Sequence, residues 1–401
     1  MDMRQTAQAL RHLVIFRNLR GEPLMEALAA LWEADRESAA ARMCDLAAEL
    51  YPRGTDLHQA VETLVLRDDN FYVRAAASQL TAGLQAEQWL ERELALLEGA
   101  VLSSEAFCIR FDLKDRGEEL PAWSAEGERF AQVYRRMLER SPQSGFGVFA
   151  QYHVFSVSPQ GRLTPVEHPD PQQLSELYGY EAEREKLIKN TQALLQGLPA
   201  NNVLLYGDAG TGKSSTVKAL ANACRDQGLR LIQVEKSRLR HIPALLDILS
   251  GLPLKFILFI DDLSFASDDR DFTALKTVLE GSVAARSGNT VVYATSNRRH
   301  LVQETFQQRQ GDEIHLSDTL EEVASLSARF GIVITFGKPN RDLYLSVVAQ
   351  LAEREGLDAP EEQLFQEAEA FALRSGGRSP RVARQYVEYK IAMSGSGSCA
   401  N

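Results

Sequence analysis

An eight-residue segment, GDAGTGKS, constrains the fold of this chain more than any other. It spans residues 207–214 and matches the pattern GxxxxGK[ST] at every fixed position. An apolar run at residues 202–206 precedes it, and apolar side chains at helical spacing follow it over residues 215–223. The pattern is informative where a strand leads into it and a helix follows, and both conditions hold here. The segment therefore predicts a strand, a phosphate-binding loop and a helix; a plain glycine turn between strand and helix is the alternative.

We call residues 207–214 the phosphate loop, and its chemistry explains the prediction. Glycine has no Cβ, so the loop can turn tightly and aim its backbone N–H groups at an anion. The N-terminus of the following helix adds partial positive charge. We expect Lys213 to reach the β- and γ-phosphates of a nucleotide and the Ser214 hydroxyl to ligate Mg²⁺. The expected nucleotide contacts in this segment are Gly207, Asp208, Ala209, Gly210, Thr211, Gly212, Lys213, Ser214 and Ser215.

Residues 171–337 read as an α/β core in which apolar runs alternate with helical patterns. Runs that are apolar on both faces indicate a parallel sheet covered by helices on both sides. Ligands of such sheets bind beyond the carboxyl ends of the strands, where Gly207, Asp261 and Asn297 fall. We therefore predict a five-stranded parallel sheet. The expected strands are residues 202–206, 229–234, 255–262, 289–297 and 332–336.

Polar side chains end two of these runs. The run KFILFIDD ends in Asp261 and Asp262, which is the Walker B pattern. We expect Asp261 to hold Mg²⁺ and Asp262 to orient or deprotonate the attacking water, although helix capping is an alternative for two acids after a strand. Asn297 ends the next run, where its amide can hydrogen-bond the attacking water or the γ-phosphate, or simply form a turn.

Arginines further along the chain are candidates for anion contacts. Arg329 comes just before the fifth strand and can reach a nucleotide bound to the next subunit of a ring, where it would stabilise transition-state charge. An ion pair with an acidic neighbour is the alternative. Arg381 begins the last helix and can contact the γ-phosphate from a helical lid, or can be a surface residue. Arg378 and Arg384 are rival candidates for that contact.

The regions on either side of the core are mostly helical. Residues 1–170 carry helical patterns and a short β segment near residues 147–166, with no phosphate loop, nucleophile–base pair or metal-ligand spacing. We interpret them as an N-terminal domain that packs against or recognises a partner. Residues 338–393 predict a lid of three helices, and the serine- and glycine-rich residues 394–401 a flexible tail.

Composition excludes several classes of protein. A net charge of −11 argues against a chain dominated by nonspecific binding to DNA or RNA, while allowing a local basic patch. The 4 cysteines show no CxxC pair, which is typical of reduced thiols in a cytosolic protein. No run of about 18 apolar residues is present, and the N-terminus lacks a signal-peptide core. We therefore expect a cytoplasmic protein with no membrane span.

Taken together, these segments resemble the AAA+ ATPases over roughly residues 172–393, and in particular the bacterial group called domain of unknown function 815. The resemblance implies an AAA+ phosphate-loop fold and an ATP hydrolase that uses ATP and Mg²⁺. It also implies a homo-oligomer, with a hexamer favoured, that acts on an unknown protein or protein–nucleic-acid partner. The matching segments are NNVLLYGDAGTGKSS (201–215), KFILFIDDLSF (255–265), LKTVLEGSV (275–283), ATSNRRHL (294–301), SLSARFG (325–331) and GGRSPRVARQ (376–385).

The resemblance also implies a role for each matching residue. Most AAA+ motors end Walker B in Asp-Glu, so Asp262 is one methylene shorter than the usual residue and slower hydrolysis follows. The implied roles are Walker A for Lys213 and Ser214, Walker B for Asp261 and Asp262, sensor 1 for Asn297, the arginine finger for Arg329, sensor 2 for Arg381, and contact with adenine for Tyr178, Gly179 and Tyr180.

Three functions are consistent with this pattern. The first is an oligomeric AAA+ ATPase that remodels or loads a macromolecular partner. The second is a nucleotide-dependent binding switch with little turnover, which the shortened Walker B acid favours. The third, a phosphate-loop kinase, is disfavoured because such kinases do not need Asn297, Arg329 and a three-helix lid in this order.

Overall fold

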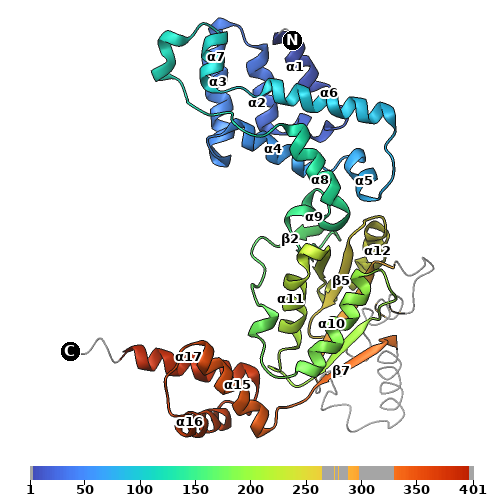
Figure 1. Cartoon of the computed structure of the whole chain (residues 1–401), viewed down its shortest axis with the longest axis vertical. Helices are drawn as coiled ribbons and strands as arrows, with labels where there is room; N and C mark the ends of the chain where they lie inside the picture. The colour runs from blue at the N-terminus through green and yellow to red at the C-terminus, as the bar shows by residue number, and fades with distance from the viewer. Residues whose placement is uncertain (1–2, 264–274, 276–278, 280–287, 298–328, 397–401) are drawn as a thin grey trace. The chain divides into compact units, whose positions relative to one another are not determined.

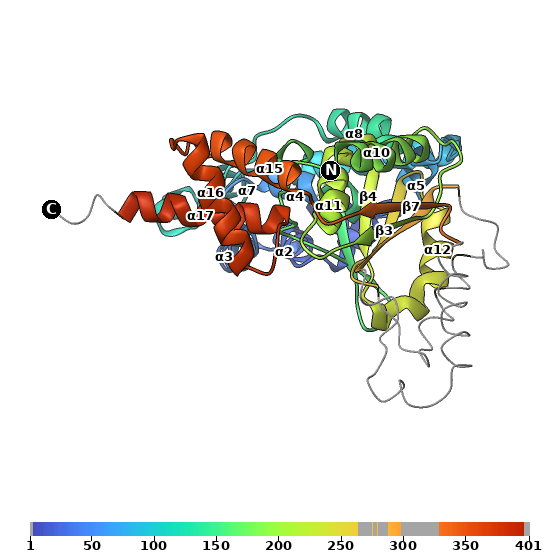
Figure 2. The same cartoon turned by 90° about the horizontal axis from the view of Figure 1, so that it is seen from below.

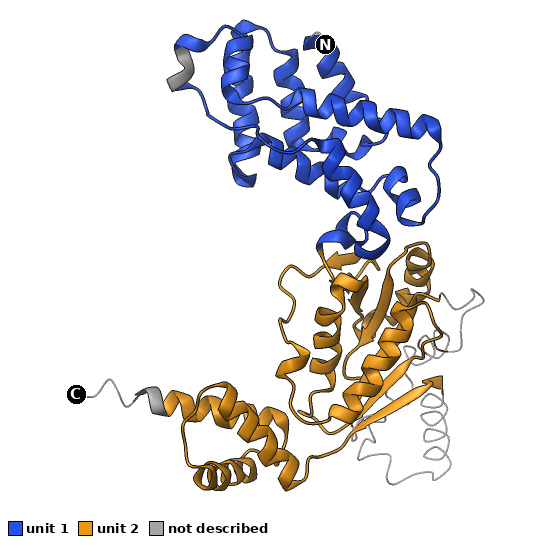
Figure 3. Ribbon diagram, viewed as in Figure 1, with its two compact units in different colours: residues 1–151 blue, residues 152–401 orange. Residues whose placement is uncertain are grey.

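The structure, a computed structural model, describes residues 3–263, 275, 279, 288–297 and 329–396 (Figure 1). It divides into two compact units, residues 1–151 and 152–401 (Figure 3). The expected boundary near residue 170 does not coincide with this division. Within the part of the chain that the structure describes, every helix is too short or too polar to span a lipid bilayer.

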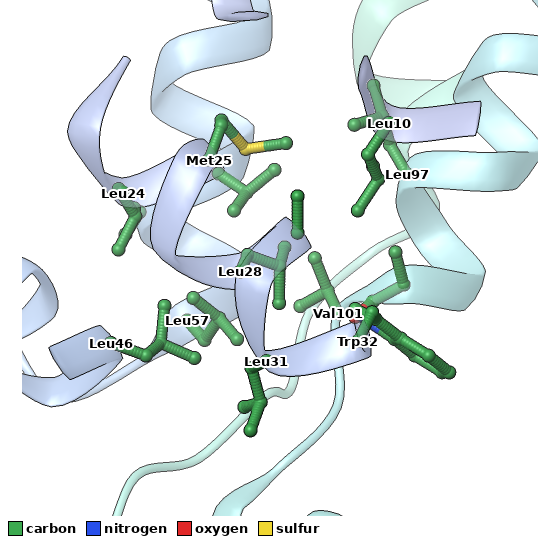
Figure 4. Close-up of a cluster of buried hydrophobic side chains, with 14 of the residues drawn as sticks. Leu10, Leu24, Met25, Leu28, Leu31, Trp32, Leu46, Leu57, Leu97 and Val101 are labelled. Atoms are coloured by element: carbon green, nitrogen blue, oxygen red, sulfur yellow. The ribbon is translucent and has the colours of Figure 1, made fainter. Parts of the chain in front are cut away.

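The first unit is helical and has its own hydrophobic core (Figure 4). The apolar face of helix α2 is buried, with Leu28 and Leu31 fully inaccessible to solvent and Trp32 2% exposed. Between α5 and α6 the chain turns through left-handed backbone at Gln79 and Gly83. The α-helices are α1 (Met3–Arg11), α2 (Pro23–Glu33), α3 (Arg36–Leu50), α4 (Leu57–Arg67), α5 (Phe71–Ala77), α6 (Leu84–Ala100), α7 (Ser104–Arg110), α8 (Phe130–Ser144) and α9 (Val148–Gln151), with 3-10 turns η1 (Arg17–Gly21), η2 (Tyr51–Arg53) and η3 (Lys114–Glu119).

The second unit is built on a 7-stranded sheet in the order β2-β1-β4-β5-β6-β3-β7. The five predicted parallel strands are confirmed, and they pair in register without a break from β4 to β7. The strands are β1 (Val154–Val157), β2 (Leu163–Pro165), β3 (Val203–Gly207), β4 (Leu229–Gln233), β5 (Lys255–Ile260), β6 (Thr290–Asn297) and β7 (Ile332–Phe336).

The β segment expected near residues 147–166 extends this sheet instead of belonging to the N-terminal domain. Strand β1 pairs parallel to β4, and β2 returns antiparallel on β1. This pairing assigns the segment to the second unit, because β1 completes the hydrogen bonding of the β4 edge. Residues 148–151, which we expected to be extended, form the short helix α9.

Helices cover both faces of the sheet. On one face, alternate strand residues such as Leu205 and Phe259 pack against α10 (Glu181–Leu195) and α11 (Lys213–Ala223). The opposite face contacts α12 (Ile242–Ser250). The phosphate loop joins β3 to α11, so the N-terminus of α11 lies at the carboxyl edge of the sheet. The short turns of this unit are η4 (Leu174–Glu176), η5 (Arg225–Gln227) and η6 (Lys236–His241).

The predicted lid is present as three helices (Figure 2). Their side chains form a separate hydrophobic core. The helices are α15 (Arg341–Arg354), α16 (Glu361–Arg374) and α17 (Pro380–Ser396). The Ser379 hydroxyl accepts a hydrogen bond from the Val382 N–H at 3.2 Å, which fixes the start of α17. Helix α17 includes residues 394–396 of the expected tail, and the rest of that tail lies outside the described residues.

Gly207, at the end of β3, is a position where only glycine fits. A Cβ there would lie 1.9 Å from the Phe336 carbonyl oxygen of β7, and the residue has φ +145°. We expect Gly207→Ala to destabilise the fold by more than about 2 kcal/mol, because both the backbone angle and the neighbouring strand oppose the methyl group. The urea unfolding midpoint measures this loss. Gly251→Ala is the control, since its Cβ would meet only Ile248 O at 3.8 Å, and equal midpoints for the two variants would contradict the prediction.

Candidate functional site

A cavity of about 490 Å³ lies at the carboxyl ends of β3, β5 and β6. One end is formed by the phosphate loop and polar side chains from the strand ends. The other is formed by the segment before α10 and by the lid. The lining residues are Gln172, Glu176, Leu177, Tyr178, Arg184, Ala209, Gly210, Thr211, Gly212, Lys213, Ser214, Ser215, Thr216, Asp261, Asp262, Thr295, Asn297, Val347, Leu351, Pro380, Arg381 and Arg384.

Lys213 is a buried cation at the phosphate-loop end of this cavity, with 7% of its surface exposed. Its Nζ donates to the carbonyl oxygens of Gly207 at 3.0 Å and Asp208 at 2.7 Å, and to Asn297 Oδ1 at 3.0 Å. Burial lowers the pKa of Lys213, while the nearby carboxylates of Asp208, Asp262 and Asp261 oppose this shift. The three hydrogens of the ammonium group are thus directed at the loop itself and at the end of β6.

The loop around Lys213 depends on its glycines. Gly212 has φ +90° and immediately precedes α11, and Gly210 has φ +79°. A Cβ on Gly210 would lie 3.1 Å from Ser379 Oγ and 3.3 Å from Arg381 Cβ, so the lid approaches the loop closely here. The Arg381 N–H donates to the Gly210 carbonyl at 3.2 Å. Backbone contact therefore ties the start of α17 to the phosphate loop.

Ser214 and Asp261 form the second feature of the site. The Ser214 hydroxyl donates to Asp261 Oδ1 at 2.5 Å, and the Thr295 hydroxyl donates to the same oxygen at 2.6 Å. Carboxylate and hydroxyl oxygens are the ligands that Mg²⁺ prefers. The predicted pair of magnesium ligands is thus brought together by β5 and the first turn of α11.

Asp262 and Asn297 form the third feature. Asn297 Nδ2 donates to Asp262 Oδ1 at 2.8 Å, while Asn297 Oδ1 accepts from Lys213. Asp262 has φ +54°, a left-handed conformation that is rare outside glycine, asparagine and aspartate. This backbone turns the carboxylate of Asp262 away from the β5 ladder and toward Asn297.

Of the three arginines considered for the lid contact, two line the cavity and one does not. Arg381 and Arg384 line it. Arg378 instead forms a two-pronged ion pair with Glu369, with nitrogen–oxygen distances of 2.8 and 2.6 Å. Arg384 lies 3.5 Å from Gln172 Oε1. The ion pair holds Arg378 on the lid and leaves Arg381 and Arg384 as candidates.

The turn before α10, which we call the aromatic turn, consists of Tyr178, Gly179 and Tyr180. Its two tyrosines lie in different environments. Tyr178 lines the cavity. Gly179 and Tyr180 are left-handed, with φ of +72° and +60°. The ring of Tyr180 packs 5.3 Å from that of Phe336, its hydroxyl donates to Gly337 O at 2.5 Å, and burial raises the pKa of that hydroxyl to about 12. Among the described residues, Tyr178 is therefore the one member of this turn that lines the cavity.

Comparison with known proteins identifies the family. A family model described as a protein of unknown function, DUF815, matches residues 150–394, which is more than half of the chain. The chain belongs to the DUF815 family. No curated protein sequence matches it.

Several solved structures are similar to this DUF815 chain. The Thermotoga maritima RuvB Holliday junction branch migration motor is 18% identical with a TM-score of 0.34, and the match covers 54% of this chain and 63% of RuvB. The FIGL-1 AAA domain in complex with ADP is 19% identical with a TM-score of 0.37, and the match covers 54% of this chain and 72% of that domain. The chain thus spans less than two thirds of the RuvB structure.

Several predicted residues of the DUF815 region lie outside the cavity lining. Gly207 and Asp208 approach the site through their carbonyl oxygens, which accept from Lys213. Arg329 lies just before β7 and is not among the residues that line the cavity of its own chain.

Two residues that line the cavity, Thr295 and Glu176, were not predicted from the sequence. Thr295 stands two positions before Asn297 on β6, and residues two apart on a strand point to the same face, which was an available signal. Glu176 accepts from Arg354 at 2.6 Å and from Gln172 Nε2 at 2.8 Å. No local pattern marks this ion pair, because its members are far apart in the chain.

Proposed function

We propose that this chain is an AAA+ ATPase that binds ATP with Mg²⁺ and hydrolyses it. One observation carries the proposal: at one end of a single cavity, hydrogen bonds join Lys213 to Asn297 and Asn297 to Asp262, and a further bond joins Ser214 to Asp261. A cation, two oxygen ligands for a metal, a carboxylate base and an amide are the groups that phosphoryl transfer to water requires.

The residues present fit a magnesium nucleotide. The glycines of the phosphate loop leave room for phosphate oxygens beside backbone N–H groups, and Lys213 supplies a buried positive charge. Ser214 and Asp261 would hold Mg²⁺, which when bound neutralises charge on the phosphates. Asp262 would accept a proton from the attacking water, and Asn297 would orient that water.

At the other end, the cavity suits a nucleobase. Tyr178, Val347 and Leu351 provide aromatic and aliphatic surface there. We assign Arg381 to the γ-phosphate contact from the lid, because its backbone is tied to Gly210 of the phosphate loop. Closure of the lid would exclude water from the reacting groups.

We further propose that the ATPase works as a homo-oligomer, with a hexamer favoured. Arg329 lines no part of its own chain's cavity, which fits a role in the site of a neighbouring subunit. The helical first unit, with its separate core, would recognise the protein or protein–nucleic-acid partner that the ATPase remodels or loads.

Turnover as a function of protein concentration tests the oligomer. We expect ATP turnover per chain to rise with concentration, and Arg329→Ala to lower it by roughly 1000-fold while ATP still binds, because an arginine supplied by a neighbour acts on the transition state. Arg225→Ala, which removes an exposed arginine of η5, is the control. Turnover that is independent of assembly and unchanged in Arg329→Ala would exclude the ring.

A nucleotide-dependent binding switch is the second candidate. The Asp262 carboxylate is one methylene shorter than glutamate and is already hydrogen-bonded to Asn297, which favours slow turnover. The switch would be supported if the purified chain binds and releases nucleotide but does not go on producing phosphate. Fast multiple turnover by the purified chain would exclude it.

A further inference from the structure

We infer that Thr295 is a positioning residue that holds both acids of the site, Asp261 by its side chain and Asp262 by its backbone, through one hydroxyl group. The inference rests on the proposed function, because it concerns how the magnesium ligand and the water-activating acid are held. No motif assigns a role to this residue, which lies in the interior of β6 with 2% of its surface exposed.

The hydroxyl of Thr295 both donates and accepts a hydrogen bond. It donates its single hydrogen to Asp261 Oδ1 at 2.6 Å, and it accepts the backbone N–H of Asp262 at 2.8 Å. One hydroxyl has one hydrogen to donate, so the donor partner is fixed as the carboxylate. Thr295 therefore contacts the side chain of one acid and the backbone of the next.

The hydrogen bond from the Asp262 N–H to Thr295 matters because the chain leaves the sheet at Asp262. The β5–β6 ladder ends at the pair Ile260 and Ala294, and Asp262 then adopts φ +54°. Such a conformation persists when surrounding bonds over-determine it. The bond from Asp262 N–H to Thr295 Oγ1 is one of these, and the bond from Leu263 N–H to the Thr295 carbonyl at 2.7 Å is another.

The two residues after Thr295 also form hydrogen bonds with the segment that follows β5. The Ser296 hydroxyl donates to Leu263 O at 2.8 Å, and Asn297 Nδ2 donates to Asp262 Oδ1 at 2.8 Å. Three consecutive side chains of β6 thus hold the three residues that follow β5. Thr295 is the member of this set that contacts both acids.

The hydrogen bond from the Thr295 hydroxyl to Asp261 Oδ1 helps to fix how the Asp261 carboxylate faces Ser214. Thr295 and Ser214 both donate to Asp261 Oδ1, at 2.6 and 2.5 Å, so the rotation of the carboxylate is defined by two hydroxyls from different elements. Without the Thr295 hydroxyl, the carboxylate would be held, among the described residues, by Ser214 alone. The Asp262 N–H would also lose its partner in a site that is partly buried.

A structural role and a positioning role predict different measurements. If the Thr295 hydroxyl only stabilises the fold, its removal lowers stability and leaves the magnesium dependence unchanged. A positioning threonine changes the magnesium dependence of nucleotide binding and turnover, because partners of metal ligands tune metal affinity.

The experiment compares Thr295→Val, which keeps the shape and removes the hydroxyl, with Thr295→Ser, which keeps the hydroxyl. Thr290→Val is the matched control on the same strand, where the hydroxyl contacts Asn289 Oδ1 at 3.1 Å. Binding of a fluorescent ATP analogue is titrated with Mg²⁺ and repeated in EDTA. We expect Thr295→Val to need about 10- to 100-fold more Mg²⁺ than the wild type and to bind unchanged in EDTA, with Thr295→Ser and Thr290→Val close to wild type.

Unchanged magnesium dependence in Thr295→Val would overturn the inference, as would a Thr295→Ser variant that behaves like Thr295→Val. If Thr295→Val does not fold, Thr295→Cys takes its place, since a thiol is a weak donor of similar size. A wild-type chain that binds no magnesium nucleotide would overturn the proposed function as well. If the wild type binds the magnesium nucleotide and Thr295→Val shows the same magnesium dependence, this inference is overturned and the proposed function is not.

Discussion

Lys213→Ala should abolish the stabilisation of this chain by magnesium ATP and lower ATP turnover by at least about 100-fold. The Lys213 ammonium is the buried cation at the phosphate end of the cavity, and its three hydrogen bonds all go to the loop and to Asn297. A phosphate group would take over these donors. The variant removes the charge and leaves the three acceptors facing one another.

A thermal melt with and without ligand measures this effect. A ligand present at about 100 times its dissociation constant stabilises a protein by roughly 2.7 kcal/mol, so the wild-type melting temperature should rise. That of Lys213→Ala should not. Lys189→Ala is the control, because Lys189 is exposed on α10 and pairs with Glu185 at 2.8 Å. An equal rise in Lys213→Ala and in the control would contradict the assignment of the phosphate loop.

The five parallel strands from β4 to β7 could be predicted because each lies in a mostly apolar run that is followed by polar residues or glycine. The place of β1 and β2 in the sheet could not be predicted from the sequence. Their residues are typical of strands, but membership of a sheet depends on which edge accepts the hydrogen bonds, and β4 is 72 residues further along the chain from Val157 to Leu229. Pairing over such a distance leaves no local pattern in the sequence.

Within the site, residues at fixed spacing were predictable and residues selected by tertiary contacts were not. Arg378, Arg381 and Arg384 lie on one short segment, and Glu369 of the preceding helix removes Arg378 from the candidates. In the aromatic turn, left-handed backbone at Tyr180 sends its ring to Phe336 and leaves Tyr178 on the cavity.

Asp262→Asn should keep nucleotide binding and lose turnover by about 100- to 10,000-fold, the usual contribution of a general base. Asparagine has the same shape as aspartate and tolerates the left-handed backbone that Asp262 adopts at φ +54°. Its amide oxygen can still accept from Asn297 Nδ2, as Asp262 Oδ1 does at 2.8 Å. The variant therefore removes the proton acceptor and leaves the fold and the cavity in place.

Measured together, affinity and turnover of this variant separate the two proposed functions. For an ATPase, Asp262→Asn binds ATP as the wild type does and releases far less phosphate, while Asp226→Asn, at an exposed residue of η5, leaves both unchanged. For a binding switch, the wild type itself releases little phosphate, so the substitution alters turnover hardly at all. An Asp262→Asn chain that hydrolyses ATP at the wild-type rate, in a wild type that turns over rapidly, would show that another group activates the water. The position of Asp262 between Asn297 and Thr295 argues against that outcome, because both of its neighbours hold it at the phosphate end of the cavity.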